Sequence, residues 1–453
     1  MIKFPRVARG AAVSVFALGL LSMTPAWGAQ AVPFGGFTVG SIPVEFLLFA
    51  CVLAGVAMFH QWTLPVALTG AVVIAAYKIF ASPFKAGIGL PGFLSHLTHE
   101  WVILVNLLLL LMGFALLAKH FEESQVPAVL PRYLPDDWKG GFVLLLLVFV
   151  LSSFLDNIAA AMIGGAIAHT VFRGKVHIGY LAAIVAASNA GGAGSVVGDT
   201  TTTMMWIAGI SPLEVLEAYI AATVALVVCG IPAALKQQAF SPIQRDATAG
   251  ARIDWPRVAV VAFILIAAVF VNVLVNTRFN HVSDAFPFLG AAVWAALLLS
   301  TGLRKPDWSL LPGAFKGSVF LLSLVLCASM MPVEHLPAAS WQTALGLGVL
   351  SAVFDNIPLT ALAINQGGYD WGFLAYAVGF GGSMIWFGSS AGVALANMYP
   401  QARSVGQWLR HGWFVAVGYV AGFFVMLALI GFHPGSTPRA GSVSAGPAVT
   451  VGK

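Results

Sequence analysis

The sequence predicts an all-α polytopic membrane protein. It is expected to be an inverted repeat of two five-crossing halves, each with a re-entrant hairpin and a broken transmembrane helix. The composition, the placing of polar interruptions in apolar segments and the loop charges support this prediction. Of the 453 residues, 59% are hydrophobic and only 9% are charged, whereas soluble domains carry about 25% charged residues. The apolar residues form runs long enough to cross a bilayer.

The N-terminus, residues 1–29, has the pattern of a signal peptide. Lys3, Arg6 and Arg9 precede a short apolar stretch, 11–21, and small residues follow it. Cleavage after this stretch is the prediction, and an uncleaved first helix is the alternative.

The first transmembrane repeat is predicted over residues 41–236. Three plain spans are followed by two interrupted segments and one plain span. Asp156-Asn157 interrupts the fourth segment, and Gly, Ser, Asp and Thr residues between Ser188 and Thr203 interrupt the fifth. The six segments are 41–59, 63–81, 101–118, 140–172, 177–208 and 214–235.

The second repeat, 257–432, shows the same order of segments. A polar linker, 237–256, separates the halves, and a Gly/Ser/Pro/Ala-rich tail, 433–453, is predicted to be disordered. Asp355-Asn356 interrupts the fourth segment and a Gly- and Ser-rich stretch interrupts the fifth. The six segments are 257–276, 285–302, 315–333, 341–368, 372–397 and 411–432.

The two fourth segments are also alike in sequence. Residues 152–158, Ser-Ser-Phe-Leu-Asp-Asn-Ile, align with residues 351–357, Ser-Ala-Val-Phe-Asp-Asn-Ile. One Asp-Asn pair inside an apolar stretch could arise by chance. Two pairs at equivalent places favour an internal repeat.

Loop charges indicate how the fourth segments are inserted. If both return to their own side as hairpins, and the mature N-terminus lies outside, the inner loops carry fourteen Lys and Arg residues and the outer loops two. The positive-inside rule therefore favours hairpins, the first on the inner side and the second on the outer side. The outer residues are Lys85 and Arg278. The inner residues are Lys119, Arg132, Lys139, Arg173, Lys175, Lys236, Arg245, Arg252, Arg257, Arg304, Lys305, Lys316, Arg403 and Arg410.

The four interruptions are candidates for a binding site, because non-helical backbone in a membrane needs protein, water or an ion to satisfy its polar groups. Their side chains supply three carboxylates with many hydroxyl and amide oxygens, and no Lys or Arg. Such a set suits a hard cation such as Na⁺ or Li⁺, or a proton. The candidates are Ser152, Asp156, Asn157, Ser188, Asn189, Asp199, Thr200, Thr201, Thr202, Thr203, Ser351, Asp355, Asn356, Ser389 and Ser390.

Carboxylates inside a bilayer must be neutralised, because each costs roughly 2.5–3.5 kcal/mol at the centre. A carboxyl group that loses its proton when a cation arrives would exchange one for the other. Two structural alternatives stay open. The Asp-Asn pairs could cap helices within hairpin turns, and the hydroxyls of 200–203 could pack helices, with Thr201 and Thr202 the better ion candidates. No nucleophile–base or metal-ligand spacing indicates an enzyme.

Five stretches within residues 40–432 carry a family resemblance. They are Asp-Asn-Ile (156–158), Ser-Asn-Ala-Gly-Gly (188–192), Gly-Asp-Thr-Thr-Thr-Thr-Met-Met-Trp (198–206), Phe-Asp-Asn-Ile-Pro (354–358) and Gly-Ser-Ser-Ala-Gly-Val (388–393). Through them the chain resembles the NhaD-type Na⁺/H⁺ antiporters of the ion transporter superfamily, whose relatives include arsenite permeases and dicarboxylate and citrate carriers.

The resemblance implies a homodimer in the lipid of the inner membrane, with elevator-like movement of a transport domain against a scaffold. It implies exchange of Na⁺ or Li⁺ for H⁺, with these transported ions and no cofactor or nucleic acid. A Na⁺- or H⁺-coupled carrier of citrate, a dicarboxylate or an arsenite-like oxyanion is the alternative, and a channel is a third possibility. With Asp355, the implied cation and proton site comprises Ser152, Asp156, Asn157, Asn189, Asp199, Thr201, Thr202, Ser351, Asn356, Ser389 and Ser390, with Na⁺ at Asp156, Asn157, Asp199 and Asn356.

Overall fold

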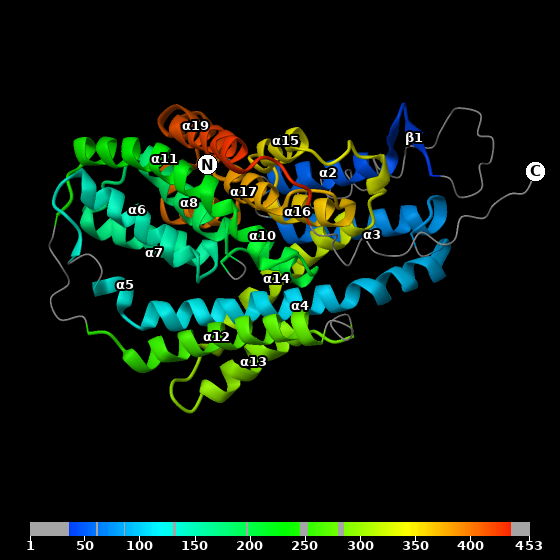
Figure 1. The fold of residues 1–453 in the computed structure, drawn as a ribbon, viewed down its shortest axis with the longest axis horizontal. Helices are drawn as coiled ribbons and strands as arrows, with labels where there is room; N and C mark the ends of the chain where they lie inside the picture. The colour runs from blue at the N-terminus through cyan, green and yellow to red at the C-terminus, as the bar shows by residue number, and fades with distance from the viewer. Residues whose placement is uncertain are drawn as a thin grey trace, which may run out of the picture.

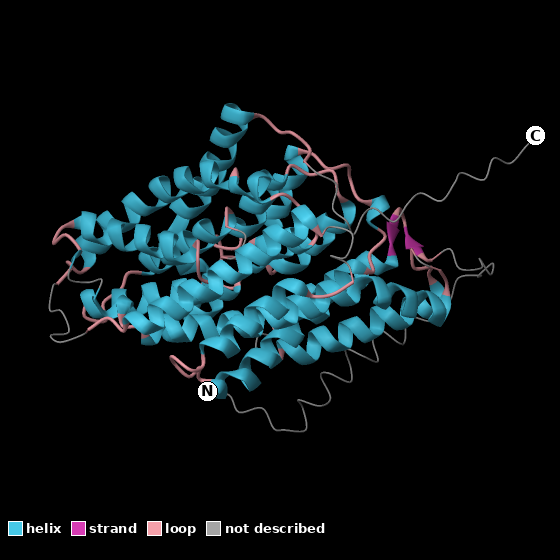
Figure 2. Ribbon diagram, turned by 60° about the horizontal axis from the view of Figure 1, so that its bottom comes forward, coloured by secondary structure: helices cyan, strands magenta, loops and turns pink. Residues whose placement is uncertain are grey.

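The chain folds almost entirely into helices. The computed structural model describes residues 36–59, 62–85, 87–129, 133–195, 198–244, 252–279 and 285–435. Within these residues, six helices are long and apolar enough to cross a membrane. The prediction of an all-α polytopic membrane protein is therefore confirmed (Figures 1 and 2). The predicted signal peptide, the middle of the linker and most of the tail lie outside the described residues.

The first part of the chain follows the predicted order of spans and interruptions. A short hairpin of two strands, β1 (Thr38–Val39) and β2 (Ile42–Pro43), precedes the first span. The helices are α2 (Val44–Met58), α3 (Thr63–Ala81), α4 (Gly89–Glu123), α5 (Val126–Val129), α6 (Trp138–Ser152), α7 (Asn157–Val171), α8 (Ile178–Ala193), α9 (Thr200–Ile207), α10 (Pro212–Leu216) and α11 (Ala218–Phe240).

The second part repeats this order, with the short 3-10 helices η4 and η5 at the places of α5 and α10. Both interrupted segments again divide into two helices at the polar residues. The elements are α12 (Trp255–Arg278), α13 (Phe288–Ser300), η3 (Trp308–Leu310), α14 (Leu311–Ser329), η4 (Val333–His335), α15 (Trp341–Ser351), α16 (Asn356–Gln366), α17 (Trp371–Gly381), α18 (Ser390–Met398), η5 (Pro400–Arg403) and α19 (Val405–Ile430).

Helix α4 runs along one side of the molecule, and α12 and α13 pack on its outer side (Figure 1). The sequence predicts a span over 101–118, but the helix starts at Gly89 and has 35 residues. Hydrophobicity does not mark its first three turns, because they contain His96, His99 and Glu100. At 1.5 Å per residue, α4 is about 52 Å long, which exceeds the roughly 30 Å hydrocarbon core of a bilayer.

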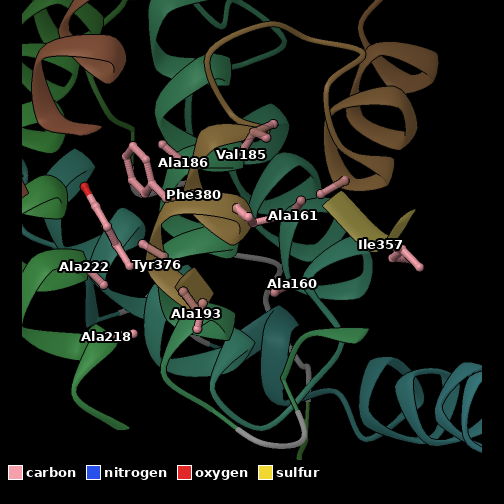
Figure 3. Close-up of a cluster of buried hydrophobic side chains, with 14 of the residues drawn as sticks. Ala160, Ala161, Val185, Ala186, Ala193, Ala218, Ala222, Ile357, Tyr376 and Phe380 are labelled. Carbon is pink, nitrogen blue, oxygen red and sulfur yellow. The ribbon is translucent and has the colours of Figure 1, made fainter. Parts of the chain in front are cut away.

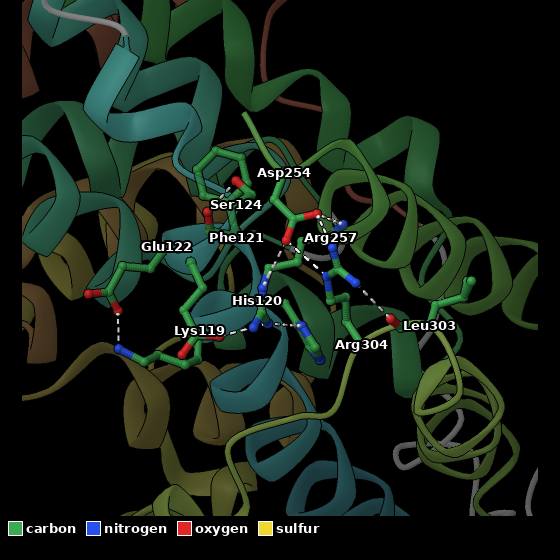
Figure 4. A network of polar contacts seen from close by, with 10 residues as sticks. Lys119, His120, Phe121, Glu122, Ser124, Asp254, Arg257, Leu303 and Arg304 are labelled. Atoms are coloured by element: carbon green, nitrogen blue, oxygen red, sulfur yellow. Dashed lines mark hydrogen bonds and ion pairs between the residues drawn. The ribbon is translucent and has the colours of Figure 1, made fainter. Parts of the chain in front are cut away.

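A network of charged side chains joins one end of α4 to the start of α12 and to the loop after α13 (Figure 4). Arg257 contacts Glu123 at 2.6 Å and its Nη1 lies 3.1 Å from His120 Nδ1. Arg304 donates to both carboxylate oxygens of Asp254, at 2.9 and 3.2 Å. Bidentate pairing of this kind fixes orientation as well as charge, so the network fixes how these elements meet.

Replacing Asp254 with Asn should lower the melting temperature of the detergent-purified protein by about 1–2 °C at pH 7. Hydrogen bonding from Arg304 holds the pKa of Asp254 below its usual value. A group with a depressed folded pKa contributes stability above its unfolded pKa and loses it as pH falls through the folded value. The difference between wild type and variant should therefore shrink below about pH 4. A difference that grows on acidification would contradict this assignment.

The helices on either side of the Asp-Asn pairs are short. Helices α6 and α7 have 15 residues each, and α15 and α16 have 11 each. At 1.5 Å per residue they extend about 22 Å and about 17 Å, less than the thickness of a hydrocarbon core. Each pair packs against a helix that is buried on nearly all sides, α6 and α7 against α8 and the other pair against α17.

The centre of the fold is filled by small and aromatic side chains from these buried helices. Figure 3 shows Ala186 and Ala193 of α8 near Tyr376 and Phe380 of α17. Small residues let helices approach closely in membranes, and this close approach brings the chain interruptions toward one another.

Three aromatic rings connect α15, α17 and α19. The rings of Tyr376, Phe380 and Tyr419 are stacked, with interplanar angles between 11° and 26°. The hydroxyl of Tyr376 donates to Tyr419 O on α19, and the hydroxyl of Tyr419 donates to Leu345 O on α15. The stack and its hydrogen bonds hold the three helices together.

Candidate functional site

The three carboxylates of the interruptions cap the helices that follow them. Asp156 accepts a hydrogen bond from Ile158 N at 3.1 Å, and Asp355 accepts one from Ile357 N at 3.0 Å. Asp199 caps α9 in the same way. The Asp residues of both Asp-Asn pairs thus cap helices, as one of the structural alternatives proposed. Capping uses one oxygen of each carboxylate and leaves the other for a further partner. Helix N-termini also favour negative charge at these places.

Asp199 keeps one carboxylate oxygen without a hydrogen-bond partner in the described chain. Its Oδ1 accepts from Thr201 N at 3.1 Å, whereas Oδ2 is buried and unpaired. The whole residue is only 2% exposed. Burying an unpaired carboxylate oxygen is costly, so this atom is the strongest sign of a ligand in the molecule.

The hydroxyls that follow Asp199 divide into two kinds. Those of Thr202 and Thr203 donate to Asp199 O, at 2.9 and 2.8 Å. The buried Thr201 hydroxyl interacts with the Asp199 carboxylate, but it makes no hydrogen bond of standard geometry within the described residues. Of the two favoured hydroxyls, that of Thr201 is available to a ligand and that of Thr202 serves the backbone.

Amide and hydroxyl side chains from distant parts of the sequence form one buried network. Asn157 donates to Asn189 Oδ1 at 3.1 Å, and Asn189 Nδ2 donates to Ser383 at 2.9 Å and to Ser389 at 3.1 Å. Asn189 lies within α8, five residues before the chain leaves helical geometry. The sequence analysis did not single out Ser383, because no spacing or motif sets this serine apart from other Gly-rich positions.

Asp355 opens onto a cavity of about 280 Å³ between α2, α3 and α14 on one side and the chain interruptions on the other. Its second oxygen accepts from Ser390 at 3.1 Å. Ile158, next to the first Asp-Asn pair, lines the same cavity. Residues of the two interruptions, which lie 199 residues apart in the sequence, therefore border the same cavity.

The remaining predicted residues are buried beside the same helices. Ser351 donates to Val378 O at 2.8 Å, and the Ser152 hydroxyl has no partner in the described chain. Asn356 has no side-chain hydrogen bond within the described residues. Thr360, one turn after Asn356, also has a buried hydroxyl without a partner, and the sequence analysis did not single it out.

The site is negative and rich in oxygen. Asp199 lies within electrostatic range of both Asp156 and Asp355, and none of the described residues that line the cavity at Asp355 is a Lys or an Arg. Carboxylate, amide and hydroxyl oxygens are ligands that hard cations accept. The donor set therefore fits a small cation or a proton.

Comparison with known proteins places the chain in a family. Residues 63–381 match the family model described as citrate transporter. Sodium/proton antiporter 1 of Arabidopsis thaliana is 28% identical over 336 residues, which cover 65% of this chain and 56% of that protein. The Na⁺/H⁺ antiporter NhaD of Halomonas elongata is 26% identical over 342 residues, 63% of this chain and 66% of the relative. That of Vibrio parahaemolyticus is 26% identical over 337 residues, 62% and 78%.

The match thus spans little more than half of the first of these relatives. The family model itself covers well over half of the present chain, including every predicted site residue except Ser389 and Ser390. With six helices able to cross a membrane, this chain is a multi-pass membrane protein that belongs to the citrate transporter family, within the ion transporter superfamily, and is similar there to antiporters of the NhaD type.

Proposed function

We propose that this protein exchanges Na⁺ or Li⁺ for H⁺ across the inner membrane. The unpaired oxygen of the buried Asp199 is the observation that supports this function most directly. The names of the matched antiporters agree with it. A buried carboxylate is stable only when a proton or a cation neutralises it.

Exchange follows from competition for this carboxylate. A cation that enters the site displaces the proton, and a proton that returns displaces the cation. Because the group is costly to leave charged and unpaired, the empty ionised form is rare. One cargo therefore leaves only when the other arrives, which couples the two gradients.

The proposed architecture is an inverted repeat of two five-crossing halves. In it, α6–α7 and α15–α16 are re-entrant hairpins, and α8–α9 and α17–α18 are broken transmembrane helices. The short lengths of the hairpin helices support this arrangement. The basic loop residues favour a cytoplasmic position for the start of α3, and in the proposed topology the cavity at Asp355 would admit ions from the cytoplasm. Homodimer formation and elevator-like movement belong to the same proposal.

The cavity does not suit the alternative cargo, citrate. Its lining is mostly apolar, with Thr63, Asp355, Ser390 and Asn397 as the polar residues. A carrier of a tricarboxylate needs basic groups or several helix N-termini to balance the negative charge. A carboxylate in the lining would instead repel such a substrate.

Purified protein in liposomes with an internal pH dye provides the test. Adding NaCl or LiCl outside should make the interior alkaline at a rate that saturates with cation concentration. Choline chloride should give no such signal, because the cation is too large for coordination by the site. Empty liposomes are the control for leak.

Three outcomes would contradict the proposal. A signal that requires citrate and persists without a Na⁺ gradient would indicate an organic anion carrier. A flux that rises linearly with concentration would indicate a channel. No response to any cation at any pH between about 6 and 9 would remove cation–proton exchange altogether.

A further inference from the structure

The interruptions of α8–α9 and α17–α18 have matching local packing. A Cβ added at Gly192 would lie 3.0 Å from Asp199 Cβ, and a Cβ added at Gly382 would lie 3.1 Å from Ser389 Cβ. Both pairs are seven residues apart. Gly192 and Asp199 are thus equivalent to Gly382 and Ser389, with an offset of 190 residues.

With this offset, Asn189 of α8 is equivalent to Gly379 of α17. Asn189 faces Ser383 and Ser389. A Cβ at Gly379 would face the equivalents of those serines, at 3.5 Å from Ala193 Cβ and 3.4 Å from Asp199 Oδ2. The same contacts therefore occur twice in the molecule, with different side chains.

At the first of the two equivalent positions, Asn189, the side chain fills the space between the helices and makes hydrogen bonds there. The Asn189 amide group accepts from Asn157 and donates to two serine hydroxyls. Its NH₂ group is bound by oxygen atoms, as a small cation would be. All the polar atoms that this amide contacts there are fully buried or nearly so.

The other place has oxygen atoms and no counterpart of the Asn189 amide, because Gly379 stands at that position. Gly379 and Ala193 cannot bond to Asp199, whose Oδ2 is buried and unpaired. The Thr201 hydroxyl, which interacts with Asp199, also makes no hydrogen bond of standard geometry within the described residues. Asn356, which is equivalent to Asn157, lies at the start of α16, and α16 packs against both α9 and α17.

We infer that the protein binds one alkali cation per chain, in the half of the site formed by Asp199, Thr201 and Asn356 against Gly379. The amide of Asn189 takes the place of a second cation in the other half. The inference rests on the proposed exchange function and narrows it, because Asp156 and Asn157 are then outside the direct coordination shell. Gly379 acts as a specificity-determining position by leaving Asp199 Oδ2 without a side-chain partner.

Replacing Gly379 with Asn tests this assignment. The new amide can donate to Asp199 Oδ2, as Asn189 donates to Ser389, and it would occupy the cation position. In detergent, NaCl at constant ionic strength should raise the wild-type melting temperature with a single-site dependence, since a ligand that binds the folded state stabilises it. The Gly379→Asn variant should melt at or above the wild-type temperature without Na⁺, and its response to Na⁺ should disappear.

Gly346→Asn is the matched control, because a side chain at Gly346 meets nothing within 4 Å. It should keep the wild-type response to Na⁺. If Gly379→Asn does not fold, Gly379→Ala tests the proposed cation site instead, since its methyl group makes only ordinary van der Waals contact with Asp199. It should weaken apparent Na⁺ affinity by about tenfold, equivalent to about 1.4 kcal/mol.

Undiminished Na⁺ affinity in Gly379→Asn, or in Gly379→Ala when the first does not fold, would overturn the inference. A two-site dependence in the wild type would overturn it as well. These results differ from failure of the proposed function, in which the wild type shows neither Na⁺ stabilisation nor Na⁺-driven proton movement.

Discussion

Replacing Asp199 with Asn should reduce Na⁺-driven proton movement in liposomes to below roughly 1% of the wild-type rate. The amide cannot take up or release a proton, and it carries no charge to hold a cation. Loss of about 3 kcal/mol of cation binding alone corresponds to about a hundredfold. The neutral side chain can still accept from Thr201 N, so the cap on α9 and the fold should be kept.

Asp307→Asn provides the matched control, because Asp307 caps η3 through Ser309 at an exposed position. This variant should transport at the wild-type rate. Melting curves and elution profiles of both variants should resemble those of the wild type. Substantial exchange by Asp199→Asn, with the same dependence on Na⁺, would show that the carboxylate is not the shared group.

The second large effect is expected on stability. Replacing Gly191 with Ala should destabilise the protein by about 3 kcal/mol, at the upper end of the range for overpacking. The new methyl group would collide with Phe149 O, which belongs to the backbone of α6. A helix backbone cannot rotate away as a side chain can, so α6 and α8 would have to separate. The melting temperature and the yield of monodisperse protein measure the effect.

Gly346→Ala separates this collision from the general effect of alanine in a helix. Gly346 lies in α15, with nothing within 4 Å of the added methyl group. Helix propensity alone favours alanine there by up to about 1 kcal/mol, so this variant should be as stable as the wild type or slightly more so. Equal losses in both variants would mean that helix packing at Gly191 is not the cause.

The sequence predicted the order of helices well, because each interrupted segment carries its own signal. Both Asp-Asn pairs mark the start of the second helix of their segment, with the Asp as N-cap and the Asn as the first helical residue. The boundaries were harder to predict wherever polar residues continue a helix. Helix α4 extends over His96 and His99, and Ser188, expected within an interruption, lies inside α8 with its hydroxyl bonded to Val185 O.

The site was predictable in its residue types and not in its internal geometry. Its carboxylates stand out because charge is rare in apolar segments. The bond between Asn189 and Ser383 spans 194 residues, and neither neighbouring sequence shows that the two will meet. The importance of Gly379 was also hidden, because its role depends on having no side chain opposite Asp199.

The stacked rings of Tyr376, Phe380 and Tyr419 determine which helices can move independently of one another. The rings join α17 to α19, and the Tyr419 hydroxyl bonds α19 to α15. Sliding of α19 would therefore break the ring contacts and both tyrosine hydrogen bonds at once. We expect bending to concentrate in the connections between helices, such as residues 330–340 between α14 and α15, which contain only the short η4. Movement of α19 would therefore carry α15 with it, and the second Asp-Asn pair, which follows α15, would move as part of the same unit.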